Sequence, residues 1–143
     1  MPQAVGVNYL LCRAGRVLCA LPLQHVRETM RPLPVEALAG TPEFVRGISI
    51  LRGLPTPVVD LGVLLGGAAL PSPSRWVTMK PQDRQVALCC DEVLGVRPLV
   101  RLDSLPPLLR DARPDLIERL GTLDEHLLLI LRGASLIPEG ELP

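Results

Sequence analysis

The sequence predicts an all-β fold of barrel-like architecture. Short apolar runs recur at roughly ten-residue spacing, and turn-forming Gly and Pro residues separate them. No segment with helical periodicity extends beyond a turn or two. With 143 residues, of which 48% are hydrophobic, the chain is long enough to bury a sizeable core. We therefore expect one domain, residues 1–143, made mostly of strands with short helices.

The first elements predicted are a hairpin and a short helix. Residues 9–13 and 16–21 are apolar runs joined through a pair that contains Gly15, which favours a tight turn. In residues 23–30, apolar side chains at spacings of three and four predict a turn or two of amphipathic helix. Residues 31–42 hold three prolines and are expected to be irregular.

Two strands and a helix start follow. Residues 45–51 alternate in apolar character, residues 52–55 turn the chain, and residues 56–59 form the next strand. Asp60 is a good N-cap, because its carboxylate can accept hydrogen bonds from the free N–H groups of a first helical turn. Two glycines at 66–67 should end that helix.

A proline- and serine-rich segment at residues 70–75 is the clearest linker in the sequence. It predicts two approximate subdomains, residues 1–69 and 76–143, and leaves open an exchange of strands between them.

Beyond the linker the predicted elements are again short strands. They are residues 76–79, 85–90, 93–100 and 116–120, followed by a closing hairpin over 122–131. Residues 105–114 are punctuated by prolines and are expected to be irregular. The last strand, residues 127–131, is apolar on both faces, which predicts burial.

Composition excludes several classes of function. Fifteen basic and fifteen acidic side chains give a net charge of zero, and the sequence holds one Tyr, one Phe and one Trp. A nucleic-acid surface needs a basic face and stacking aromatics, so no nucleic-acid partner is expected. The first residues lack the basic and apolar regions of a secretory signal, and no apolar stretch reaches the roughly 20 residues of a membrane span. We expect a cytoplasmic protein without direct membrane insertion.

The four cysteines do not form a pattern that binds metal or performs catalysis. Cys12 and Cys19 are separated by six residues across the first hairpin, and the adjacent Cys89 and Cys90 should point to opposite faces of a strand. Reduced, buried thiols are the expectation, although a thiol enzyme using Cys89 or Cys90 stays open. No nucleophile elbow, phosphate loop or dinucleotide motif is present. We therefore expect no enzyme, no catalytic residue, no metal site and no cofactor.

Residues 44–61 carry the most specific pattern, FVRGISILRGLPTPVVDL. This segment resembles the CheW family of chemotaxis coupling proteins, whose pattern here is roughly Lys/Arg-Gly-x-x-Asn-Leu-Arg-Gly followed by Pro-x-x-Asp-Leu. The resemblance extends to Val26-Arg27-Glu28, to Asp91 and to the final hairpin, and it covers about residues 8–138.

The resemblance implies a fold and a function. The family's fold is a pair of five-stranded, SH3-like β-barrels packed on each other. Its members are cytoplasmic adaptors that join the helical signalling tip of methyl-accepting chemoreceptors to the regulatory domain of the chemotaxis histidine kinase. Carried onto this chain, the receptor-binding residues are Val26, Glu28, Gly47, Ile48, Arg52 and Gly53. An ion pair between Glu28 and Arg52 is also implied, and Gly47 is expected to lie where a side chain would intrude on an incoming helix.

Two departures from the pattern leave alternatives open. Ile50 stands where the family usually has Asn, and Leu131-Arg132-Gly133 stands where its last strand usually runs into Leu-Asp. Neither touches Glu28 or Arg52. An adaptor that binds receptors without coupling the kinase is therefore the first alternative, and another β-barrel interaction module is the second.

Overall fold

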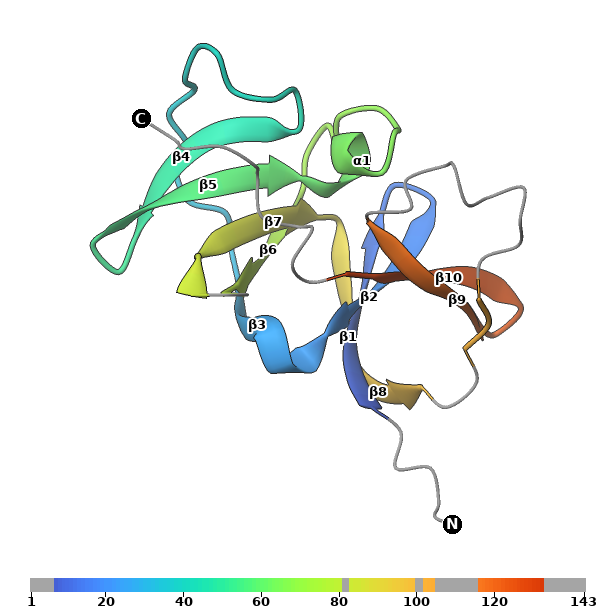
Figure 1. Cartoon of the computed structure of the whole chain (residues 1–143). Coiled ribbons are helices and arrows are strands. Elements are labelled where there is room, and N and C mark those ends of the chain that lie inside the picture. The colour runs from blue at the N-terminus through green and yellow to red at the C-terminus, as the bar shows by residue number, and fades with distance from the viewer. Residues whose placement is uncertain (1–6, 81–82, 100–101, 105–115, 133–143) are drawn as a thin grey trace.

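The chain folds into two five-stranded sheets that lie side by side (Figure 1). The computed structural model describes residues 7–80, 83–99, 102–104 and 116–132. The terminal sheet, built from both ends of the chain, has the order β8-β1-β2-β10-β9. Its strands are β1 (Val7–Ala14), β2 (Val17–Pro22), β8 (Glu92–Leu99), β9 (Ile117–Leu123) and β10 (His126–Leu131).

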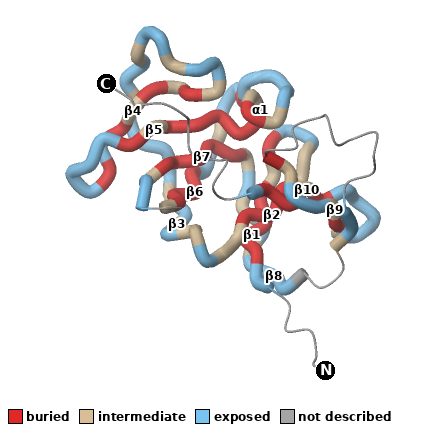
Figure 2. The backbone as a smooth tube through the Cα atoms, in the orientation of Figure 1, coloured by how far each residue is buried: buried red, intermediate tan, exposed pale blue. Residues whose placement is uncertain are grey.

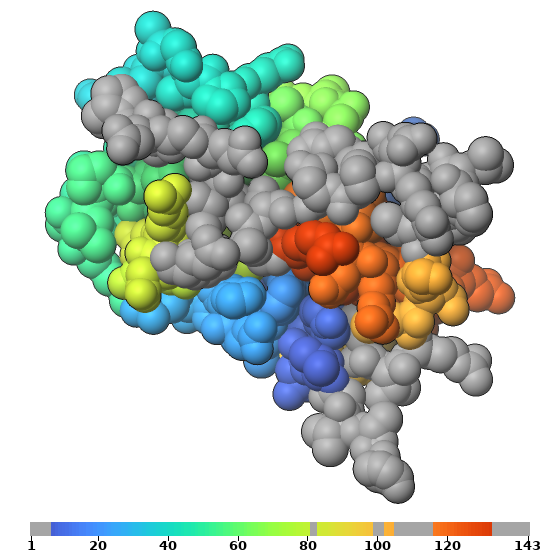
Figure 3. Space-filling model, in the orientation of Figure 1, coloured from blue at the N-terminus to red at the C-terminus, as the bar shows by residue number. Residues whose placement is uncertain are grey.

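The middle sheet holds the intervening strands in the order β3-β6-β7-β5-β4. These are β3 (Val26–Met30), β4 (Val45–Leu51), β5 (Leu54–Asp60), β6 (Arg75–Met79) and β7 (Val86–Cys90). The helix α1 (Leu61–Leu64) follows β5, and a 3₁₀ turn, η1 (Leu23–His25), leads from β2 into β3. In Figure 3 the light-blue residues of this connection lie against the dark-blue residues of β1. The predicted all-β class with two five-stranded sheets is confirmed.

Three apolar clusters account for the core. One lies between the sheets and draws buried residues from both, among them Leu10, Leu21, Val77 and Leu88. A second belongs to the terminal sheet, and a third, around Trp76, belongs to the middle sheet. Figure 2 shows this as buried segments running through the strands of both sheets, with exposed turns at their ends. Strands that bury both faces in this way need apolar side chains at consecutive positions, as in β7, whose residues are all buried.

The sheets do not divide at residues 70–75. That segment lies within the middle sheet, since β5 before it pairs in parallel with β7 after it. The terminal sheet is instead completed by β10, which pairs in parallel with β2. The chain thus passes from one sheet to the other near residues 22–26 and again near residues 90–92. The exchange of strands is therefore more extensive than a division at the linker implies.

Two local predictions were wrong. Residues 23–30 form a 3₁₀ turn followed by β3, because pairing with β6 satisfies their backbone groups and overrides the helical spacing of the apolar residues. In β10, Leu128 and Ile130 are buried as predicted, but Leu127 is 59% exposed. The predicted irregular segment 105–114 lies outside the described residues. No helix in the described ranges has the length and apolar character to cross a membrane.

Asp60 is the polar centre of the middle sheet. It is 1% exposed, and its Oδ1 accepts a hydrogen bond from the N–H of Val63, which caps α1 as predicted. Its Oδ2 accepts from the Arg46 guanidinium, with a 2.7 Å bond from Nη2, and from the N–H of Leu70 at 3.1 Å. One buried carboxylate therefore holds β4, the start of α1 and the segment that leads to β6.

A bulge in β4 directs Arg46 toward this carboxylate. Val45 and Gly47 pair with the consecutive residues Val59 and Val58, so Arg46 is the extra residue. Gly47 follows it with a φ of 149°, and a Cβ there would overlap the carbonyl oxygen of Glu36 and lie 2.7 Å from its carbon. Only glycine allows the segment before β4 to pack this closely.

Replacing Asp60 should unfold the middle sheet more readily. Asp60→Ala removes the helix cap and leaves the Arg46 guanidinium without its partner, and we expect a loss of about 3 kcal/mol in the free energy of unfolding, measured by urea denaturation. Asp103→Ala is the control, because that residue is exposed and its bonds to the described part of the chain are made by its backbone, with Leu120. Equal stability of the two variants would contradict the role given to Asp60.

Gly47 should be far less replaceable than Gly53. Gly47→Ala combines backbone strain with the overlap at Glu36, and we expect a loss of roughly 2–5 kcal/mol. Gly53→Ala is the matched variant, since Gly53 also has a positive φ but has open space around its Cβ position, and about 1 kcal/mol is expected. Urea denaturation of both variants gives the comparison, and an unaffected Gly47→Ala protein would refute the packing argument.

Candidate functional site

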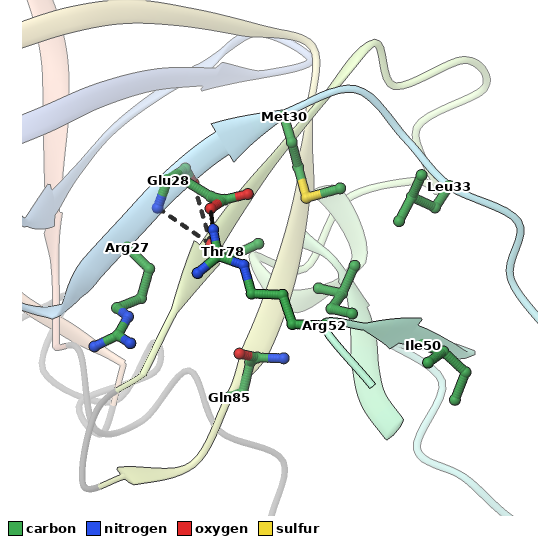
Figure 4. A pocket seen from close by; sticks show the side chains of 9 residues that line it. Arg27, Glu28, Met30, Leu33, Ile50, Arg52, Thr78 and Gln85 are labelled. Atoms are coloured by element: carbon green, nitrogen blue, oxygen red, sulfur yellow. Dashed lines mark hydrogen bonds and ion pairs between the residues drawn. The ribbon is translucent and has the colours of Figure 1, made fainter. Parts of the chain in front are cut away.

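An ion pair links the two edge strands of the middle sheet. The carboxylate of Glu28, on β3, accepts a hydrogen bond from Nη2 of Arg52, at the turn between β4 and β5. Because β3 and β4 are the opposite edges of this sheet, residues at its two ends meet here. The pair implied by the sequence resemblance is present, and Figure 4 shows it among the side chains that line a surface hollow.

Local backbone geometry positions Glu28. Glu28 is paired with Thr78 of β6, whose hydroxyl lies 3.2 Å from the Glu28 N–H and donates to its carbonyl at 3.3 Å. Val26 pairs with Met79 and Glu28 with Thr78, so Arg27 is the extra residue of a bulge. The bulge lets both Arg27 and Glu28 line the hollow, although they are adjacent in sequence.

A tight turn positions Arg52. Leu51 pairs with Leu54, which leaves Arg52 and Gly53 as a two-residue loop. Their φ values of 51° and 78° are the positive values that a type I′ hairpin turn requires. Gly53 adopts this geometry without strain and so holds its neighbour in place.

The ion pair is exposed, and this limits what it can do for stability. The side chains of Arg52 and Glu28 are 67% and 36% exposed. Surface ion pairs of this kind contribute between about 0 and 1 kcal/mol to folding. The pair orients a largely exposed guanidinium, which suits recognition of another molecule better than support of the fold.

The hollow around the pair has a volume of about 170 Å³. Its lining combines apolar side chains with the ion pair, a second arginine and two uncharged polar groups. It consists of Arg27, Glu28, Met30, Leu33, Ile50, Leu51, Arg52, Thr78 and Gln85. The Gln85 amide is fixed by a 2.7 Å bond to the Thr56 hydroxyl.

The six receptor-binding residues predicted from the sequence do not all share this hollow. Glu28 and Arg52 line it, and Gly53 adjoins it in the turn. Ile48 lines a second hollow on the outer side of β4, and Val26 packs against the core between the sheets. Gly47 is buried.

The reason expected for glycine at 47 needs correction. A side chain there would meet the chain's own backbone at Glu36 and the side chain of Val35, both on the segment that precedes β4. Glycine at this position is therefore needed for packing within the molecule.

Sequence reasoning missed several lining residues. Met30 and Leu33 lie at and just after the end of β3, and Gln85 lies just before β7, so only the folded sheet brings these two segments together. The alternating pattern of β4 gave a weak indication that Ile50 is exposed. Ile50 stands between the buried Ser49 and Leu51 and so lies on the outer face of the strand.

The cysteines are arranged as buried thiols. All four are buried, with Cys90 in the core between the sheets and Cys89 in the core of the middle sheet, on opposite faces as predicted. Burial raises the pKa of Cys89 to about 12. The pKa of Cys90 is also raised, mainly by a hydrogen bond with Cys12 and secondly by burial. Raised pKa values keep these thiols protonated and weakly nucleophilic near neutral pH. Within the described ranges, no group of three or more His, Cys, Asp or Glu side chains is placed to hold a metal ion.

Comparison with known proteins gives a consistent result. The model of the CheW-like domain matches residues 8–141. The chain is 24% identical over 144 residues to the chemotaxis protein CheW of Klebsiella aerogenes, covering 98% of this chain and 87% of that protein. It is 32% identical over 104 residues to the protein FrzA of Myxococcus xanthus, covering 71% of this chain and 65% of FrzA.

The fold agrees with a solved structure. The crystal structure of the scaffolding protein TtCheW from Thermoanaerobacter tengcongensis superposes with a TM-score of 0.79 at 23% identity, covering 90% of each chain. At that identity the likeness speaks for the fold, including the pair of SH3-like subdomains. Since the domain model spans nearly the whole sequence, the chain belongs to the CheW-like family of chemotaxis scaffold and adaptor proteins.

Proposed function

We propose that this chain is a cytoplasmic adaptor that binds the helical tip of a chemoreceptor and couples it to the chemotaxis histidine kinase. The observation that carries the proposal is the exposed ion pair between Glu28 and Arg52, set in a hollow with apolar walls. Such a site can receive the apolar stripe of a helix while a pre-oriented guanidinium binds a polar group beside that stripe.

The chemistry of the hollow supports binding without catalysis. Among the described residues, its ionisable side chains are Arg27, Glu28 and Arg52, and the carboxylate of Glu28 is already paired. A general acid or base would need a titratable group free to exchange a proton with a substrate. An adaptor transmits a signal through association alone, so the lining fits that role.

Receptor binding should depend on Arg52 while folding does not. We expect Arg52→Ala to weaken binding to a soluble receptor-tip fragment from the same organism by at least about tenfold, the effect of losing a charge-assisted hydrogen bond. Its thermal melting temperature should stay near that of the unmodified protein, because the pair is exposed. Calorimetric titration gives the affinity.

Arg97→Ala, which removes an exposed arginine from β8 of the terminal sheet, is the control and should bind normally. A folded Arg52→Ala protein that binds as well as this control would refute the proposed receptor site.

The kinase half of the proposal needs its own measurement. We expect the chain to raise autophosphorylation of the histidine kinase in the presence of receptor fragment, above the level measured with kinase and receptor fragment but without the chain. An adaptor that binds receptors without coupling the kinase would bind the fragment and leave autophosphorylation unchanged. That outcome would favour the first alternative raised by the sequence.

A further inference from the structure

Ile50 is an unusually exposed apolar residue beside the proposed receptor site. It is 61% exposed, and it lines both the hollow around the ion pair and the second hollow outside β4. Leu33, which is 39% exposed, is the other residue that lines both. A large apolar side chain that is exposed to water at such a junction would gain favourable free energy if a partner buried it.

The two shared residues make the hollows one continuous groove. The second hollow has a volume of about 560 Å³ and is mostly apolar, lined by Leu33, Pro34, Glu36, Leu38, Ile48, Ser49 and Ile50. Figure 4 shows Arg27 on one side of the ion pair and both Leu33 and Ile50 on the other. The groove therefore extends from Arg27, past the ion pair, to the segment that holds Glu36.

The backbone at this edge does not favour an added strand as occupant. In β4, Ile48 and Ile50 are paired with Pro57 and Pro55 of β5, which have no N–H to donate. The backbone N–H and C=O groups of Ile48 and Ile50 therefore face away from β5. Those of Ile48 are already bonded to Glu36, by two bonds of 2.9 Å. Among the described residues of this edge, that leaves the backbone of Ile50 alone available before the turn, too few groups for a ladder. A helix, which needs side-chain contacts alone, fits this groove better.

The ends of the groove carry opposite charges. Arg27 lies at the end near the ion pair and Glu36 at the far end, and both are exposed. Neither side chain has an ion-pair partner among the described residues, whereas Glu28 and Arg52 neutralise each other between them. An incoming helix is therefore favoured in one direction, with an acidic side chain toward Arg27 and a basic one toward Glu36.

We infer that Ile50 and Leu33 form a second, apolar contact for the receptor helix and that Arg27 and Glu36 set its direction. The inference rests on the proposed function, because it takes the receptor helix as the occupant of the groove. The helix must then extend its apolar stripe by a large apolar residue beyond those that enter the hollow around the ion pair, and must carry charged residues of opposite sign that flank the stripe. Ile50 is thereby a determinant of which receptor this adaptor selects.

The experiment is a binding titration of the whole chain with the same receptor-tip fragment. Ile50→Ser should weaken binding by about tenfold, the effect of losing one buried aliphatic side chain. Leu127→Ser is the matched control, since Leu127 is equally exposed but lies on β10 of the terminal sheet. Arg27→Glu and Glu36→Arg should each weaken binding several-fold at low salt, and Arg97→Glu should not.

The outcomes separate this inference from the proposed function. If Arg52→Ala abolishes binding while Ile50→Ser binds like Leu127→Ser, the extended groove is refuted and the receptor site stands. If the unmodified chain does not bind the fragment, both fail. If Ile50→Ser is impaired but neither charge reversal has an effect, the apolar contact holds and the assignment of direction is refuted.

Discussion

The middle sheet depends on one buried carboxylate. Asp60 receives hydrogen bonds from a bulged arginine of β4, from the first turn of α1 and from the segment that leads to β6. An uncompensated charge at this depth would cost several kcal/mol, so these three contacts must form together. They fix β4, and with it the turn that presents Arg52. The geometry of the exposed recognition surface thus depends on a buried carboxylate that is not part of that surface.

Stability and recognition reside in different residues of the same strand. Gly47 and the bulge at Arg46 hold β4 from the inside, where space is too limited for any side chain at Gly47. Ile50 and Arg52 project outward and contribute little to holding the fold. This separation allows the outward residues to change with the partner while the inner ones stay fixed.

Local signals predicted much of the fold and a part of the site. Gly15 and the Arg52-Gly53 pair mark two hairpins through their own backbone preferences, and Asp60 marks a helix start through its own side chain. No local signal showed which strands belong to which sheet, because β2 pairs with β10, which lies more than 100 residues further along the sequence. For the same reason the helical spacing in residues 23–30 was misleading, since β6 decides their conformation.

The site shows the same limit. Family resemblance indicated Glu28 and Arg52, but Leu33 and Gln85 reach the hollow only because the two edges of the sheet approach each other. Gly47 was assigned a surface role from the same resemblance, because no pattern in the irregular segment around Val35 and Glu36 indicates that it packs against Gly47.

The parallel pairing of β2 with β10 also bears on how the protein can be made. During synthesis, β1 and β2 emerge before the other strands, yet their sheet lacks β9 and β10 until residues 117–131 have been translated. The middle sheet has no such delay, since all five of its strands lie within residues 26–90. Closing so long a loop carries an entropic cost that grows with its length. The apolar faces of β1 and β2 therefore stay open on the ribosome longer than any other part of the described core, and they are the surfaces that a chaperone would have to shield.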